Sequence, residues 1–101
     1  GVPDAPAPGP RGGLAPARPN PFQGTTTIHF AVDQAGPVEL AIYDVSGRLV
    51  RGLVHGAASA GDQQVSWDGR DDAGRRAAPG VYLYRFRSGN VVQSKRVILL
   101  R

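Results

Sequence analysis

The chain has 101 residues and no cysteine, so it is long enough for one small domain and contains neither a disulfide nor a thiolate metal site. Its 12 basic and 8 acidic residues give a net charge of +4, but the basic residues are scattered, which argues against a nucleic-acid partner. No stretch has the features of a signal peptide, and no apolar run approaches the roughly 18 residues of a membrane span.

Residues 1–18 are mainly Pro, Ala and Gly, and we interpret them as a linker. Prolines at positions 3, 6, 8, 10 and 16 prevent both a helix and a central strand. A segment of this composition is semi-extended and similar to polyproline. We therefore expect a linker over 1–18, attached to a larger upstream part of the same protein, and a folded domain over 19–101. The alternative is a frayed terminus.

From residue 19 onward, apolar and polar residues alternate in short stretches, which is typical of β-strands with one buried face. Turn residues such as Gly36-Pro37 and Ser88-Gly89-Asn90 separate these stretches. No window shows helical spacing between caps. Six or seven strands predict an antiparallel sandwich of two sheets. The expected strands cover residues 25–32, 38–43, 49–54, 63–67, 81–87 and 91–100, and residues 56–61 are expected to form a loop.

Large aromatic side chains indicate where the core lies. Tyr82, Tyr84 and Phe86 share one face of a strand, while Phe30 and Trp67 lie on the inward parity of two others. Because the chain has no covalent crosslink, its stability depends on packing of this kind. We expect these five side chains to form the core between the sheets.

Three aspartates follow Trp67 in a turn that is rich in glycine. Asp68, Asp71 and Asp72 offer the oxygen ligands that calcium prefers. Their spacing lacks the alternating Asp-x-Asp-x-Asp-Gly pattern and the closing Glu of a calcium loop. We therefore favour a structural role, in which the carboxylates accept N–H bonds within the turn, and we predict no metal site and no cofactor.

No motif for catalysis is present. His29 and His55 lie apart from any nucleophile motif, and two isolated histidines do not supply the three protein ligands of a catalytic zinc site. We therefore predict that the domain is not an enzyme.

Two surface features allow alternative interpretations. Arg85, Arg87, Lys95 and Arg96 form a basic stripe if their strands pair, and such residues either bind a partner or protect a sheet edge from aggregation. The second feature is a set of side chains that suits a sugar, namely Thr25, Thr27, His29 and Tyr43.

Several short blocks follow one another in a characteristic order. They are Pro19-Asn20-Pro21-Phe22, Thr25 to Phe30, Val38 to Val50, Ala60-Gly61, Trp67 to Asp71, Gly74, Pro79 to Tyr84 and Lys95 to Arg101. In this order they resemble the C-terminal sorting domain, type A, of type IX secretion cargo, and the resemblance extends from Leu14 to Arg101. That family is similar to the immunoglobulin-like domain of the flagellar hook-capping protein, which shares the Trp-Asp-Gly and Gly-Val-Tyr blocks.

The resemblance implies an all-β, immunoglobulin-like antiparallel β-sandwich of about seven strands. It also implies a non-catalytic module at the C-terminus of a larger exported protein of a Gram-negative bacterium. The partners would be the upstream cargo domain, the outer-membrane secretion machinery and a cell-surface sortase that attaches cargo to an anionic lipopolysaccharide. The alternatives are a passive spacer or assembly domain and a carbohydrate-binding accessory module of a secreted hydrolase.

The resemblance places the recognition element on the final strand. Its basic pair is Lys95 and Arg96, its apolar run consists of Val97, Ile98, Leu99 and Leu100, and its basic terminus is Arg101. A strand at a sheet edge can offer its backbone to a receptor strand while alternate side chains fill pockets. Both parities of the apolar run are hydrophobic, so the sequence leaves open which one faces the core. We expect deletion of residues 95–101 to abolish export while folding survives.

Overall fold

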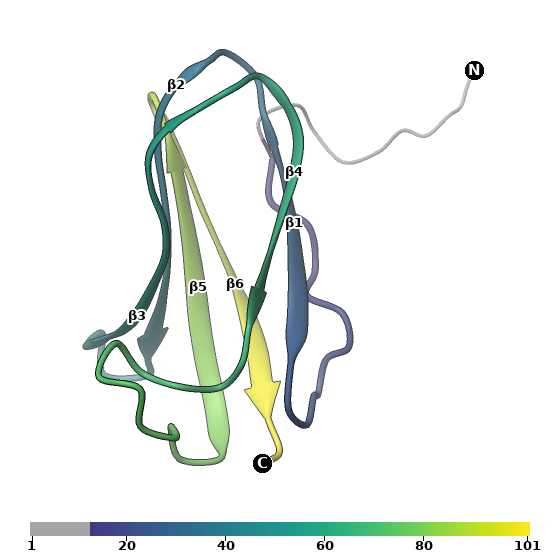
Figure 1. Cartoon of the computed structure of the whole chain (residues 1–101), viewed down its shortest axis with the longest axis vertical. Coiled ribbons are helices and arrows are strands. Elements are labelled where there is room, and N and C mark those ends of the chain that lie inside the picture. The colour runs from purple at the N-terminus through teal and green to yellow at the C-terminus, as the bar shows by residue number, and fades with distance from the viewer. Residues whose placement is uncertain (1–12) are drawn as a thin grey trace.

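The structure is a computed structural model that describes residues 13–101. Within this range it is an all-β sandwich without a helix, and therefore without a helix that could cross a membrane (Figure 1). The strands are β1 (Thr26–Val32), β2 (Gly36–Asp44), β3 (Leu49–Ala58), β4 (Gly61–Trp67), β5 (Gly80–Ser88) and β6 (Val91–Leu99). The predicted antiparallel sandwich is confirmed, with six strands instead of about seven.

The sandwich has a two-stranded sheet, β1-β4, and a four-stranded sheet of order β3-β2-β5-β6. All four strand pairs are antiparallel. Alternation of side chains determines which face is buried: in β1, Ile28, Phe30 and Val32 are at most 5% exposed, while His29 is exposed. β6 lies at one edge of the larger sheet.

The turn between β2 and β3 is stabilised by a single carboxylate. Asp44 Oδ1 accepts hydrogen bonds from Ser46 N at 3.0 Å, Ser46 Oγ at 2.6 Å and Arg48 N at 3.0 Å. Gly47 has a φ of 89°, a conformation that glycine adopts without steric cost. These local bonds begin the hairpin that places β3 beside β2.

The loop expected over residues 56–61 is largely strand. β3 continues to Ala58 and β4 starts at Gly61, so that only residues 59 and 60 lie between them. The cause is pairing with β2, in which Val38 lies opposite Gly56 and Gly36 lies opposite Ala58. Ladder pairing here overrides the low strand propensity of small residues.

Residues 13–22, here called the N-terminal segment, belong to the folded domain. Leu14 and Ala17 are at most 4% exposed, and Arg18 exchanges backbone hydrogen bonds with Thr27 of β1 at 2.8 and 2.9 Å. The linker expected over 1–18 therefore requires a correction, because residues 13–18 cover a sheet edge and fill core space. Residues 1–12 of that expected linker lie outside the described range.

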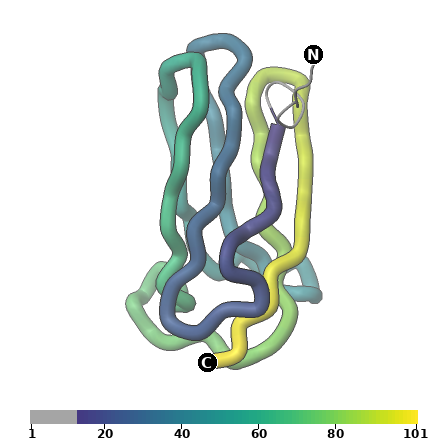
Figure 2. The backbone as a smooth tube through the Cα atoms, turned by 90° about the vertical axis from the view of Figure 1, so that its right-hand side faces the viewer, coloured from purple at the N-terminus to yellow at the C-terminus, as the bar shows by residue number. Residues whose placement is uncertain are grey.

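The N-terminal segment passes from one sheet to the other. Figure 2 shows it between β1 and β6 along one side of the sandwich. Its first half pairs with β1, and Phe22 then forms a parallel bridge with Leu99 of β6. The segment thereby closes this side of the molecule.

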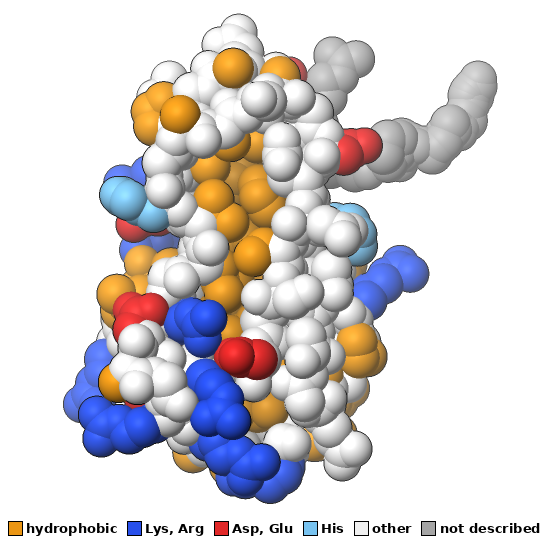
Figure 3. Space-filling model, viewed as in Figure 1, with side chains coloured by type: hydrophobic (Ala, Val, Ile, Leu, Met, Phe, Trp, Pro, Cys, Tyr) orange, Lys and Arg blue, Asp and Glu red, His pale blue; other side chains and the backbone are white. Residues whose placement is uncertain are grey.

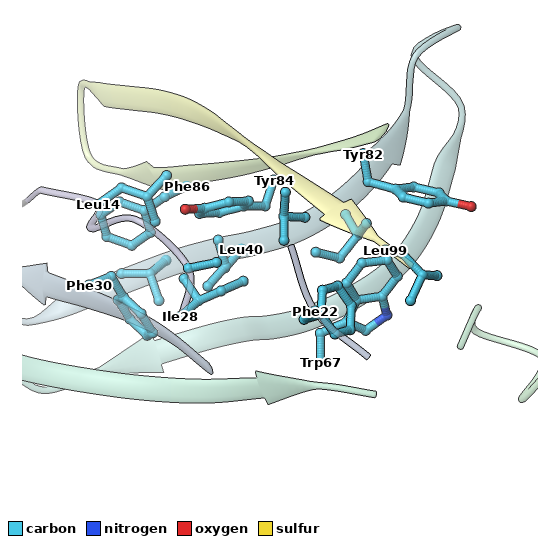
Figure 4. Packing of buried hydrophobic residues seen from close by; sticks show 14 of the residues in the cluster. Leu14, Phe22, Ile28, Phe30, Leu40, Trp67, Tyr82, Tyr84, Phe86 and Leu99 are labelled. Atoms are coloured by element: carbon cyan, nitrogen blue, oxygen red, sulfur yellow. The ribbon is translucent and has the colours of Figure 1, made fainter. Parts of the chain in front are cut away.

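The core lies between the sheets and contains two aromatic clusters (Figure 4). The ring centroids of Phe30 and Phe86 are 5.1 Å apart, and the Trp67 ring lies 5.5 Å from Phe22 and 5.3 Å from Tyr82. Such tilted and edge-on contacts suit the charge distribution of aromatic rings. The residues that the sequence indicated as core are at most 7% exposed, namely Phe30, Trp67, Tyr82, Tyr84 and Phe86.

Candidate recognition site on the last strand

The two parities of β6 have different environments. Val97 and Leu99 face the core and are 0% and 4% exposed, whereas Ile98 and Leu100 are 37% and 49% exposed. Burial of the first pair supports the sandwich, so these two side chains cannot contact a partner in the folded domain. Only the second pair is accessible for recognition.

The accessible side chains of β6 continue an apolar surface on β5. Ile98 lies opposite Val81, which is 39% exposed, and Arg96 lies opposite Leu83. We call the exposed set Val81, Arg96, Ile98 and Leu100 the recognition face. Lys95 is also exposed, but it lies opposite the buried Tyr84 and therefore has the other parity. The expected basic pair is thus divided between two sides of the strand.

The backbone at the outer edge of β6 is already hydrogen-bonded. Asn20 accepts a bond from Ile98 N at 2.9 Å and donates Nδ2 to Arg96 O at 3.1 Å. Phe22 N donates to Ile98 O at 2.9 Å, and Leu100 N donates to Phe22 O at 2.8 Å. A receptor strand therefore cannot pair with this stretch of the edge while these hydrogen bonds are in place, which favours recognition through side chains. In the sequence, the feature that corresponds to these edge hydrogen bonds is Asn20 between Pro19 and Pro21.

The loop after Trp67 lies against the end of β6. Trp67 Nε1 donates to Arg70 O at 2.9 Å, which ties the loop to the core. A Cβ on Gly69 would lie 3.3 Å from Leu99 Cδ1. The Trp-Asp-Gly block and the last strand, which are about 30 residues apart, are therefore packed together. Arg101 lines a cavity of about 200 Å³ beside this loop, together with Arg70, Arg76 and Asp68.

The aspartates of this loop bond to backbone and to arginine. Asp71 Oδ1 accepts from Ala73 N and Arg75 N, both at 2.9 Å. Asp72 Oδ1 accepts from Gly52 N at 3.0 Å, and Asp68 Oδ1 lies 3.1 Å from Arg51 Nη1. Among residues 13–101, no group of three or more His, Asp or Glu side chains could hold a metal ion.

The expected basic stripe is present in part. Arg85, Arg87 and Arg96 lie on the outer face of the four-stranded sheet, while Lys95 does not. Arg85 is held in place by Tyr43: its Nη2 donates to the Tyr43 hydroxyl at 2.9 Å, and its Cζ lies 4.6 Å from the ring centroid.

The expected sugar site is not assembled. Thr27 and His29 belong to β1 in the two-stranded sheet, whereas Tyr43 is on the outer face of the other sheet. The sandwich thus separates the aromatic ring from the polar side chains that were expected to join it.

Two tyrosines and one aspartate have perturbed titration. Burial raises the pKa of Tyr84, whose hydroxyl donates to Ala15 O at 2.8 Å. Burial and the nearby charge of Asp44 raise the pKa of Tyr82. Hydrogen bonds from the Ser46 hydroxyl and the Arg48 N–H lower the pKa of Asp44. All three groups support the fold, and none lies on the recognition face.

Comparison with protein families decides the membership of this domain. Residues 17–90 match the family described as FlgD Ig-like domain. The chain belongs to the FlgD Ig-like domain family. The match ends in the turn before β6, so the recognition strand lies outside it. A search of curated proteins finds no match.

Parts of several solved structures share this fold. The dimeric latent PorU of Porphyromonas gingivalis superimposes with a TM-score of 0.69 at 24% identity, over 86% of this chain and 9% of PorU. PorZ of the same organism, described as a surface component of the type IX secretion system, gives 0.63 at 23% identity, over 88% and 12%. FlgD of Xanthomonas campestris, described in terms of hook capping, gives 0.57 at 29% identity, over 74% and 55%. The chain therefore spans a small part of PorU and PorZ and about half of FlgD.

Proposed function

We propose that this Ig-like domain is the C-terminal sorting and cell-surface attachment module of a larger secreted protein, and that it acts without catalysis. In this proposal the outer-membrane machinery of type IX secretion and its sortase recognise the domain, while an upstream cargo domain performs the task of the whole protein. The protein would be exported to the cell surface or beyond, with attachment to an anionic lipopolysaccharide.

The observation that carries the proposal is the exposure of Arg96, Ile98 and Leu100 on one face of the last strand. Apolar side chains that are exposed together beside a basic residue suit contact with another protein. The order of the sequence blocks from Leu14 to Arg101 adds support, as does the likeness of the fold to domains of PorU and PorZ.

A reporter fusion tests the proposal. The full chain is fused to the C-terminus of a periplasmic reporter in a bacterium that has type IX secretion, and the reporter is then located. We expect the unchanged chain to carry the reporter to the cell surface or the medium. We expect Ile98→Ser with Leu100→Ser to leave it in the periplasm, because the apolar contact with the machinery is lost.

A matched control separates recognition from folding. Val92 has the same outward parity on β6 as Ile98 and is 53% exposed, but it lies opposite Arg87 and is not one of the four residues of the recognition face. Val92→Ser therefore removes an accessible apolar side chain that the proposed contact does not use. Protease resistance of each fusion shows that the domain is folded. Retention of the unchanged fusion in the periplasm, or export of the folded double variant at the normal level, would contradict the proposal.

A second candidate is a passive spacer or assembly module. It is favoured by membership of the FlgD Ig-like domain family and by the 29% identity to FlgD of X. campestris. Such a module would fold in the same fusion without moving the reporter, so the same experiment distinguishes the two functions.

A further inference from the structure

The two sides of the sandwich, where the sheet edges approach each other, are built differently. Between β1 and β6 the N-terminal segment fills the space, and Leu14, Phe22 and Val97 are at most 4% exposed (Figure 2). Between β3 and β4 a band of hydrophobic side chains is visible from outside (Figure 3). We call this second side the open side.

The side chains at the open side are incompletely covered. The apolar residues of β3 and β4 that pack on the core without being fully buried are Val50, Leu53, Val54, Ala58 and Val65. Two further positions are occupied by glycine and so carry no side chain. They have the inward parity, because Gly56 lies opposite the buried Val38 and Gly61 lies opposite the buried Val32. A Cβ at either glycine would have no atom within 4 Å. Residues 13–101 therefore cover the core incompletely along this side.

The outer backbone edge of β4, on the open side, has no strand partner among residues 13–101. Residues in an antiparallel ladder turn their N–H and C=O groups alternately toward and away from the paired strand. Thr27 and His29 of β1 turn theirs toward the N-terminal segment, because Thr27 bonds to Arg18 and His29 O accepts from Ala15 N. The residues opposite them, Ser66 and Gln64, must therefore turn theirs away from β1, and the same parity applies to Asp62. Within residues 13–101, none of these three has a backbone hydrogen bond on that side.

Both ends of the open side are closed. The Arg51–Asp68 ion pair, with 3.1 Å between Nη1 and Oδ1, joins β3 to the end of β4, and the turn at residues 59 and 60 joins the strands at the other end. The apolar residues between these ends offer no counter-charge to a bound group. A strand along the seven residues of β4 would extend over about 23 Å.

We propose that the open side binds a short, extended, uncharged polypeptide segment of a partner protein. The segment adds to β4 as a strand, pairs with the outward backbone groups of Asp62, Gln64 and Ser66, and places large apolar side chains at every second position between the sheets. The absence of charge among these apolar residues selects an uncharged partner segment, because a charged side chain buried there would lack a counter-ion.

A blocked heptapeptide of sequence Thr-Val-Thr-Ile-Thr-Val-Thr serves as the probe, with Thr-Asp-Thr-Asp-Thr-Asp-Thr as the charged control. We expect NMR titration of the full chain with the first peptide to shift the amide resonances of Asp62, Gln64 and Ser66 and to slow their hydrogen exchange. The charged peptide should cause neither change.

Two variants at one position isolate the backbone contribution. Gln64→Pro removes an outward N–H and leaves the ladder with β1 intact, so we expect the apolar peptide to bind about tenfold more weakly. Gln64→Ala retains the N–H and should bind normally. Absence of binding at millimolar peptide, shifts confined to β5 and β6, or equal affinity of both variants would overturn the proposal. The sorting assay is independent, because it tests side chains of β6 and not the edge of β4.

Discussion

Gly69 shows how one residue connects the sequence blocks to the last strand. Its φ is 75°, and a Cβ would lie 3.3 Å from Leu99 Cδ1. We expect Gly69→Ala to lower the free energy of unfolding by more than the roughly 1–2 kcal/mol that a left-handed backbone alone costs an alanine. Urea unfolding measures the change.

Gly74 provides the comparison. It has a similar φ of 84°, but a Cβ there would meet nothing within 4 Å. Gly74→Ala should therefore cost only the backbone term, and the difference between the two variants measures the contact with Leu99. Equal losses of stability would show that this contact does not constrain position 69.

Asp44 gives the β2–β3 turn a dependence on pH. Hydrogen bonds from the Ser46 hydroxyl and the Arg48 N–H hold the pKa of this carboxyl below its ordinary value. A lowered pKa stabilises the fold above the unfolded value of about 4, and this stability is lost as the pH falls through the folded value. We expect an NMR titration of the Asp44 carboxyl to show the lowered pKa.

Ser46→Ala tests the cause of that shift. It removes the hydrogen bond that lowers the pKa of Asp44 most, so the pKa of the carboxyl should rise toward its ordinary value. Ser59→Ala, in the turn between β3 and β4, should leave the pKa unchanged. A lowered pKa that persists in Ser46→Ala would refute the assignment.

At the scale of the strand, Asn20 protects the outer edge of β6. Its side chain bonds to Arg96 O and Ile98 N, and leucine at this position would leave both groups without a protein partner. We expect Asn20→Leu to accelerate hydrogen exchange of the Ile98 amide and to cost about 1–2 kcal/mol of stability. Gln23→Leu, also exposed but without such a bond, is the control, and unchanged exchange in Asn20→Leu would argue against protection by Asn20.

Strand periodicity was sufficient to predict the fold class and the buried face of β1, because each inward residue there alternates with an outward one. Periodicity failed where contacts between distant parts of the chain determine whether a residue is buried or belongs to a strand. Leu14 lies among prolines, and only the space between two sheets makes it a core residue. The small residues at 56–61 resemble a loop, yet pairing with β2 extends β3. The parity of β6 required the register with Tyr82, since Val97 and Ile98 are both apolar.

For the whole molecule, the burial of Val97 and Leu99 argues against the expectation that the domain folds without residues 95–101. Deletion removes Val97 and Leu99 from the core, and each buried side chain of this size contributes about 2–5 kcal/mol. A domain of this size has a total stability of only about 5–15 kcal/mol. We expect the deletion variant to lose the cooperative unfolding transition in circular dichroism. The Ile98→Ser, Leu100→Ser variant should retain it, and a cooperative transition in the deletion variant would be contrary to this prediction.

The parallel course of the N-terminal segment and β6 gives the domain a mechanical property. The segment contacts β6 at Gln93, Arg96 and Leu99 in the same order in which its own residues Leu14, Asn20 and Phe22 follow one another. The described part of the segment consequently begins in the half of the molecule opposite the C-terminus, and the molecule is 41 Å long (Figure 2). Force applied between an upstream neighbour and a grip on Arg101 would load these hydrogen bonds together in shear, instead of opening them one after another.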